Sequence, residues 1–147
     1  NLMLAASMSF IFALSVQAQS KTVLSTYMDI KDALVKTDSK NANLAANGMT
    51  SILKGKSDEL SKKLISDAEA ISASSDVKVQ RKHFDTLSQN VYEYIKKTGE
   101  KEGTVYKQFC PMAFNNTGAY WLAAEKEINN PYFGNMMLHC GAVKEEL

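Results

Sequence analysis

Two short clusters in the last third of the chain carry the residue types best suited to chemistry. They are Cys110-Pro111-Met112 and Met136-Met137-Leu138-His139-Cys140-Gly141. Thiolate and thioether sulfurs are soft ligands that select Cu(I), and imidazole is an acceptable partner for them. The two clusters therefore predict a soft-metal site that binds Cu(I) or Ag(I).

Backbone periodicity decides which of these side chains can converge. Met136 and Cys140 are four residues apart, so they share a face in a helix and also in a strand. Met137 and His139 share a face only if their segment is extended. We expect two thiolate ligands and two thioether ligands, with His139 or Met137 as a substitute. The predicted ligands are Cys110, Met112, Met136, Met137, His139 and Cys140.

The two cysteines also allow a second interpretation. In an exported chain they often close a disulfide, here Cys110–Cys140, which would be worth about 3–4 kcal/mol in the chain-entropy model. Oxidation would remove both thiolates and leave at best a Met and His site. In the metal interpretation Trp121 is expected near the site, where its ring would shield a soft cation or contact it by cation–π attraction.

Composition excludes some function classes. The chain has 147 residues, with 17 Lys+Arg against 16 Asp+Glu, and a net charge of +1. Binding to nucleic acid through bulk charge needs a clear basic excess, so no nucleic-acid partner is expected. The sequence lacks the CxxC, CxxCH, HExxH, GxSxG, GxGxxG and P-loop patterns, so we do not expect an enzyme.

The first twenty residues are uncharged, and an apolar run from Leu2 to Val16 leads into Val16-Gln17-Ala18. Signal peptidase accepts small residues three positions and one position before the cut, here Val16 and Ala18. Residues 1–18 therefore predict a signal peptide that is cleaved after Ala18. The alternative is an N-terminal membrane anchor. After cleavage, residues 19–147 would form one exported, periplasmic domain with no stable membrane span, and both cysteines would meet an oxidising compartment.

Residues 21–97 show helical periodicity throughout. Four apolar stripes repeat every three or four residues, and the second and third follow candidate N-caps at Asp38 or Ser39 and at Ser57-Asp58. Short connections between them predict an antiparallel four-helix bundle in a mostly α protein.

The tail, about residues 104–143, is expected to be compact, rich in Cys and Met, and made of short irregular or β elements. Residues 105–110 alternate like a strand. Turn formers fill residues 115–118 and 129–134. Residues 121–128 are compatible with one or two helical turns or with an irregular segment.

The tail resembles an uncharacterised exported domain family. The resemblance is carried by Tyr106-Lys107-Gln108-Phe109-Cys110-Pro111-Met112-Ala113-Phe114, Gly118-Ala119-Tyr120-Trp121-Leu122, Ile128-Asn129-Asn130-Pro131-Tyr132-Phe133-Gly134 and Met136-Met137-Leu138-His139-Cys140-Gly141. It extends from Tyr27 to Val143. Such domains occur alone and at the C-terminus of adaptor subunits of copper/silver-type heavy-metal efflux systems.

The resemblance implies a heavy-metal-associated binding module. Its motif residues correspond to Cys110, Met112, Met136 and Cys140, with Trp121 as a neighbour. We expect a free-standing periplasmic binder for metal tolerance, delivery or efflux, with an efflux adaptor or another periplasmic protein as its partner. The competing expectation is a structural, protein-interaction module with a Cys110–Cys140 disulfide and no metal.

Overall fold

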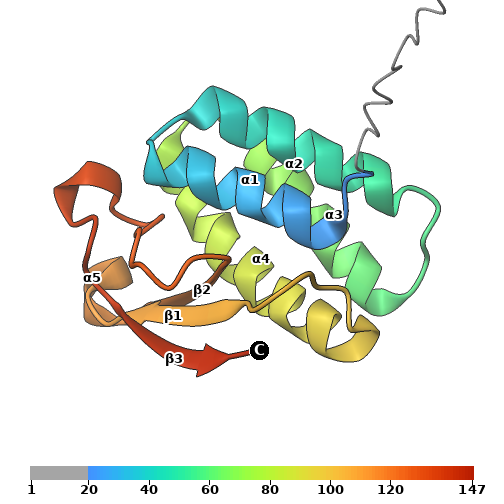
Figure 1. The fold of residues 1–147 in the computed structure, drawn as a ribbon. Helices are drawn as coiled ribbons and strands as arrows, with labels where there is room; N and C mark the ends of the chain where they lie inside the picture. The colour runs from blue at the N-terminus through green and yellow to red at the C-terminus, as the bar shows by residue number, and fades with distance from the viewer. Residues whose placement is uncertain (1–19) are drawn as a thin grey trace, which may run out of the picture.

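The computed structural model describes residues 20–147, which form four long helices followed by a small sheet (Figure 1). The signal peptide expected over residues 1–18 lies outside the described residues. No helix within residues 20–147 is long and apolar enough to cross a membrane. The long helices are α1 (Val23–Val35), α2 (Ser39–Leu53), α3 (Glu59–Ser72) and α4 (Val77–Thr98). The expected mostly helical protein with a short β-containing tail is confirmed.

Side-chain caps set where each long helix begins. Thr22 forms a capping box at α1, and Asp38, Asp58 and Asp76 cap α2, α3 and α4 by accepting a hydrogen bond from a backbone N–H in the first turn. Two of these caps, Asp38 and Asp58, are the ones that the sequence predicts. Helix α4 ends at Gly99, whose φ of 72° is the left-handed conformation that terminates many helices.

The strands form an antiparallel sheet in the order β2–β1–β3. They are β1 (Tyr106–Cys110), β2 (Ala119–Ala123) and β3 (Ala142–Glu146). Strand β1 confirms the strand expected over residues 105–110. The helical alternative for residues 121–128 is wrong, because Trp121 pairs with Gln108 of β1 and the chain is irregular after β2. The sequence pattern did not predict β3.

One hydrophobic core joins the helices to the sheet. Each long helix packs on the next, and α4 also packs on α1 and on β2. Figure 1 shows the sheet beside α4, with β3 farthest from the helices. A chain of aromatic rings connects the two parts. The ring centroids of Tyr27 and Phe84 are 5.0 Å apart, and the two rings are stacked. The Tyr132 ring links Phe84 to Trp121, with centroid distances of 5.9 Å and 6.0 Å.

Two tyrosine hydroxyls close the edge of β2 that faces the helices. The Leu122 N–H donates to the Tyr27 hydroxyl at 2.9 Å, and the Tyr132 hydroxyl donates to the Tyr120 carbonyl at 2.5 Å. An edge strand otherwise presents unpaired backbone groups to solvent or to another strand. Tyr27 of α1 and Tyr132 of the segment between β2 and β3 therefore take the place of the strand that β2 lacks on this side.

The Tyr27 hydroxyl also reaches α4. Ser88 donates its own proton to the Phe84 carbonyl at 2.7 Å, so the Tyr27 hydroxyl is the donor in its 2.8 Å bond with Ser88. Burial raises the pKa of Tyr27, which keeps this hydroxyl protonated. One side chain thus ties α1, α4 and β2 together.

Buried Gln80 completes the end of α3. Its amide nitrogen lies within hydrogen-bonding distance of the carbonyl oxygens of Ser74 (2.9 Å), Ile71 (3.4 Å) and Ser39 (3.0 Å). The last carbonyls of a helix have no partner inside the helix. Gln80 supplies one from α4 and at the same time holds the start of α2.

We expect Tyr27→Phe to lower the free energy of unfolding by about 1–3 kcal/mol, because the buried Leu122 N–H loses its acceptor. Urea unfolding followed by circular dichroism measures this change. Tyr106→Phe is the matched control, since the Tyr106 hydroxyl has no hydrogen-bond partner among the described residues. Equal effects of the two substitutions would contradict the role given to the Tyr27 hydroxyl.

Candidate functional site

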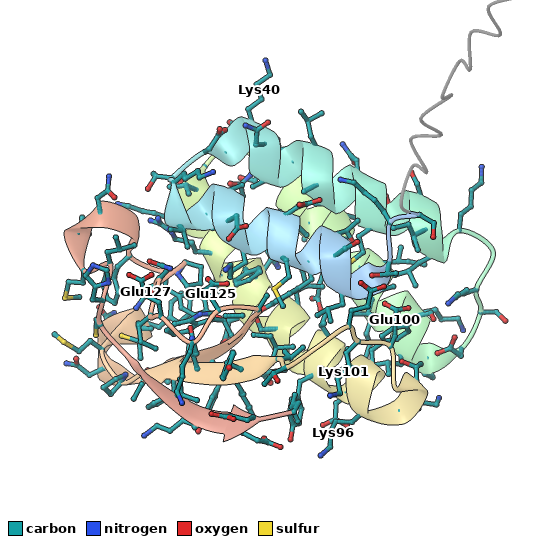
Figure 2. All side chains as sticks on the ribbon, viewed as in Figure 1. Lys40, Lys96, Glu100, Lys101, Glu125 and Glu127 are labelled. Atoms are coloured by element: carbon teal, nitrogen blue, oxygen red, sulfur yellow. The ribbon has the colours of Figure 1, made fainter. Side chains whose placement is uncertain are left out.

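Cys110 and Cys140 meet at one end of the sheet, although thirty positions separate them in sequence. Their Sγ atoms are 2.8 Å apart, and both are free thiols. Cys110 ends β1 and is fully buried, whereas Cys140 precedes β3 and is partly exposed. Figure 2 shows sulfur atoms, in yellow, gathered at this end of the molecule.

A left-handed turn follows Cys110. In α5 (Ala113–Asn116) the φ angles of Phe114, Asn115 and Asn116 are 51°, 56° and 66°. This conformation costs roughly 1–2 kcal/mol for each residue other than glycine. The Phe114 ring packs edge-on against Tyr132 at 5.3 Å, which offsets part of that cost. The turn reverses the chain so that β2 returns alongside β1.

Asn130 fixes the backbone at Cys140. It is fully buried, and its Nδ2 donates to the Cys140 carbonyl at 2.7 Å. Its backbone N–H donates to the Leu138 carbonyl at 2.8 Å, and its Oδ1 accepts from the Tyr132 N–H at 2.8 Å. The backbone that carries Cys140 is thereby fastened to the start of its own loop.

Gly141 lets the chain pass from Cys140 into β3. Its φ is 149°, and a Cβ atom at this position would lie 2.9 Å from Trp121 Cη2 and 3.0 Å from the Phe109 carbonyl oxygen. Any side chain would meet both a buried ring and the backbone of β1. Only glycine allows this close approach.

Contacts from β1 and α1 hold the segment between β2 and β3. The Gln108 Nε2 lies 3.0–3.3 Å from the carbonyl oxygens of residues 125–127. The ammonium group of buried Lys31 binds the Glu125 carboxylate. Figure 2 shows Glu125 and Glu127 on this segment, between α1 and the sheet.

Arg81 provides a further link from α4. Its Nε donates to the Pro131 carbonyl at 2.7 Å, and its terminal nitrogen donates to the Leu34 carbonyl at 2.9 Å and to Thr37 Oγ1 at 3.1 Å. The guanidinium group thus joins the end of α1 to the loop that leads to Cys140.

The contact with Cys110 also affects the protonation of Cys140. The hydrogen bond between the two sulfurs, and then burial, raises the pKa of the Cys140 thiol, while a hydrogen bond from the Met112 N–H lowers it by less. The thiolate is the form that acts as a nucleophile or a metal ligand, and its fraction increases as the pH rises. The reactivity of Cys140 should therefore increase with pH.

The other predicted ligands lie around the pair with different exposures. Met112 is 47% exposed, and Met136, at the end of η1 (Gly134–Met136), is 79% exposed. The Met137 carbonyl accepts the Cys140 N–H at 3.1 Å. His139 is exposed, and its Nδ1 lies 2.9 Å from the Ile128 carbonyl, which leaves Nε2 as the acceptor nitrogen. The structure brings the two cysteines and the Met112 backbone together and leaves Met136 and His139 at the surface.

Trp121, the expected neighbour of the site, is fully buried in β2. Its ring lies beside Gly141, the residue after Cys140, and packs edge-on against Tyr132. Its indole N–H has no hydrogen-bond partner within the described residues. The ring therefore forms part of the wall behind Cys140.

The donor atoms already in contact are two sulfurs. Within residues 20–147, no group of three or more His, Cys, Asp or Glu side chains is placed to hold a metal ion. Structural zinc sites use four nitrogen or sulfur ligands, and calcium needs a cluster of oxygens. The pair is therefore suited to a soft ion of low coordination number, or to a disulfide.

Sequence reasoning missed the residues that position Cys140, namely Asn130, Gln108 and Arg81. Asn130-Pro131 was visible only as a turn. The partners of Gln108, and two of the three partners of Arg81, are backbone carbonyls in distant segments, for which side-chain patterning carries no signal.

The fold and the site define a mostly helical protein whose terminal sheet carries a cysteine pair. Residues 23–103 match the model of a family described as a protein of unknown function, DUF3347, and the chain belongs to this family. The match covers all four long helices and ends before β1, so the cysteine pair lies outside the matched range. No curated protein and no solved structure gives a significant match to the chain.

In the reduced native protein, we expect iodoacetamide to modify Cys140 well before Cys110, because only Cys140 is accessible to solvent. The rate should increase with pH through a midpoint above that of an ordinary cysteine, since the pKa of Cys140 is raised. Peptide mapping by mass spectrometry identifies the modified residue, and denatured protein serves as the control in which both react. Preferential labelling of Cys110 would contradict the site geometry.

We expect Gly141→Ala to destabilise the protein by more than about 1 kcal/mol and to change Trp121 fluorescence, because the added Cβ meets the Trp121 ring. Gly103→Ala is the matched control: Gly103 also has a positive φ, 70°, but a Cβ there meets nothing within 4 Å. A stability loss no larger than that of the control, with unchanged fluorescence, would show that the close approach at Gly141 is unimportant.

Proposed function

We propose that this protein is an exported binder of Cu(I) or Ag(I), with Cys110 and Cys140 as its primary ligands. The observation that carries the proposal is the 2.8 Å contact between two sulfurs, one at the end of β1 and one in the segment just before β3. Packing and hydrogen bonds already fix the backbone at both cysteines, so little further ordering is needed when an ion binds. A soft monovalent ion is the ligand that a pair of thiolates favours.

Met112 is the best-placed third ligand. Its N–H bonds to the Cys140 sulfur, and its side chain is partly exposed. Met136, Met137 and the Nε2 atom of His139 are the remaining candidates, and Met136, which is 79% exposed against 47% for Met112, ranks behind Met112.

Loading an ion requires the two sulfurs to separate. Metal–thiolate bonds are about 2.3 Å long at zinc sites. With bonds of that length, sulfurs 2.8 Å apart would impose an S–metal–S angle well below the tetrahedral angle of such sites. We propose that the Cys140 side chain moves, because it is partly exposed, whereas the Cys110 side chain is fully buried. Affinity should increase with pH, since both ligands must be deprotonated.

The proposed setting is the periplasm, where the protein would act in tolerance, delivery or efflux of the ion. Support for export comes from the uncharged apolar run Leu2–Val16 and the Val16-Gln17-Ala18 sequence after it. In this proposal the long helices form an antiparallel four-helix bundle that serves as the scaffold. The partner is a heavy-metal efflux adaptor or another periplasmic protein, and no catalysis is involved.

The second candidate is a structural module without metal, in which a Cys110–Cys140 disulfide stabilises the tail and the protein binds a partner protein. The same contact favours this module, because the two sulfurs, 2.8 Å apart, need to move only slightly closer to form a disulfide bond of about 2.05 Å. The bond would join the end of β1 to the start of β3.

A competition titration of Cu(I) against a chromophoric chelator tests the proposal. We expect the reduced protein to bind one equivalent, and oxidised protein or Cys110→Ser to bind none at the same chelator strength. Met112→Ala should weaken binding by roughly tenfold or more, on the scale seen when metal-site partners are removed. Met136→Ala is the comparison, since its thioether is the more exposed, and we expect a smaller loss. No competition by the reduced protein would exclude the metal proposal and leave the disulfide module.

A further inference from the structure

We infer that the cysteine pair undergoes thiol–disulfide exchange and that external thiols and disulfides enter it through Cys140 alone. The inference does not depend on metal binding. It rests on the unequal exposure of two sulfurs that are in contact. Cys110 is 0% exposed, whereas Cys140 is partly exposed and lies 2.8 Å from Cys110. An outside reagent reaches one sulfur, and the second sulfur is already within reach of the first.

The oxidative direction has two balanced steps. The Cys140 thiolate attacks one sulfur of a small disulfide, forms a mixed disulfide and releases one thiolate. The Cys110 sulfur then attacks the Cys140 sulfur, and the second small thiolate leaves and takes up the proton that the Cys110 thiol gives up. In total, two protein thiols become one disulfide, and one small disulfide becomes two thiols.

The reductive direction reverses these steps. A thiolate of an external dithiol attacks the Cys140 sulfur, and the Cys110 thiolate is the leaving group. The second thiol of the reductant then attacks the mixed disulfide and frees Cys140. The partner class is therefore a dithiol reductant whose active sulfur can approach the surface at Cys140.

The local structure permits closure with little rearrangement. The sulfurs need to approach from 2.8 Å to about 2.05 Å. The two cysteines flank the last paired positions of the ladder, Phe109 and Ala142, so the bond links segments that are already neighbours. Asn130 holds the Cys140 carbonyl, which keeps the backbone in register during either step.

Exchange at this site also sets the condition for the proposed metal function, and only this consequence rests on that function. A disulfide removes both thiolates, while a bound ion occupies them, so the two states exclude each other. By linkage, an ion that binds only the reduced pair and is present at a hundredfold excess over its dissociation constant raises the reduction potential of the pair by about 59 mV, as two tenfold steps of 29.6 mV each.

Glutathione disulfide, added to metal-free reduced protein, is the direct probe. We expect wild-type protein to reach the internal disulfide, two hydrogen atoms lighter, without a stable adduct. Cys110→Ser should accumulate one glutathione adduct on Cys140. Cys140→Ser should react at least about tenfold more slowly, since modification of Cys110 needs local opening. In urea the two variants should react at similar rates, which shows that each retains its thiol.

Equal native rates for the two variants, or adducts on Cys110 in wild-type protein, would overturn the inference. Wild-type protein is therefore also quenched with acid within seconds and mapped, so that the result stands even if a variant folds poorly. A transient adduct on Cys140 is expected, and its absence while Cys110 carries glutathione would overturn the entry route. Exchange through Cys140 without Cu(I) binding would refute the proposed function and leave this inference intact. Cu(I) binding, together with equal rates of glutathione addition to the two variants, would refute this inference and leave the proposed function intact.

Discussion

The Tyr27 hydroxyl accepts a hydrogen bond from the Leu122 N–H of β2 and donates one to Ser88 of α4. This buried group fastens the sheet to the helical part of the molecule. A three-stranded sheet needs something to cover its edge and one of its faces, and here Tyr27 of α1 and Tyr132 supply the edge partners. Without the hydroxyl, a buried N–H would be unpaired, and the strand that positions the rest of the tail would lose its fixed distance from α1 and α4.

The position of the cysteine pair follows from that attachment. Strand β2 sets the place of β1, and the left-handed turn in α5 connects the two. The segment after β2 then folds over the Gln108 side of the sheet, where carbonyls of residues 125–127 meet the Gln108 amide. Asn130 and Gly141 finally bring Cys140 against Cys110. Each of these hydrogen bonds contributes little alone, but together they hold the two sulfurs in contact at the end of a sheet that shares its hydrophobic core with the helices.

Much of the helical part was predictable, because apolar stripes and capping side chains act locally. Asp38 and Asp58 cap helices where the sequence places them, and β1 follows a visible alternation. Strands β2 and β3 were not predictable in the same way. The burial of β2 comes from helices far away in the sequence, so its apolar residues do not alternate with polar ones, and β3 is mostly exposed and charged, with few apolar residues to mark a buried face.

The candidate site shows the same division. The sequence predicts that the side chains of Cys110 and Cys140 share one site, and the fold brings their sulfurs into contact. The exposure of Met136 could not be predicted from its spacing to Cys140, since η1 is neither a regular helix nor a strand. The backbone contacts of Asn130 join groups that sequence patterns do not encode, and a reading limited to side-chain types overlooks them.

X-ray absorption spectroscopy at the copper edge, on reduced protein loaded with one equivalent of Cu(I), tests the central claim most directly. We predict a first shell made of sulfur atoms only, with a low coordination number, that is lost in both Cys110→Ser and Cys140→Ser. A first shell of nitrogen or oxygen atoms, or a sulfur shell that persists in both variants, would contradict the assignment of the cysteine pair as the metal ligands.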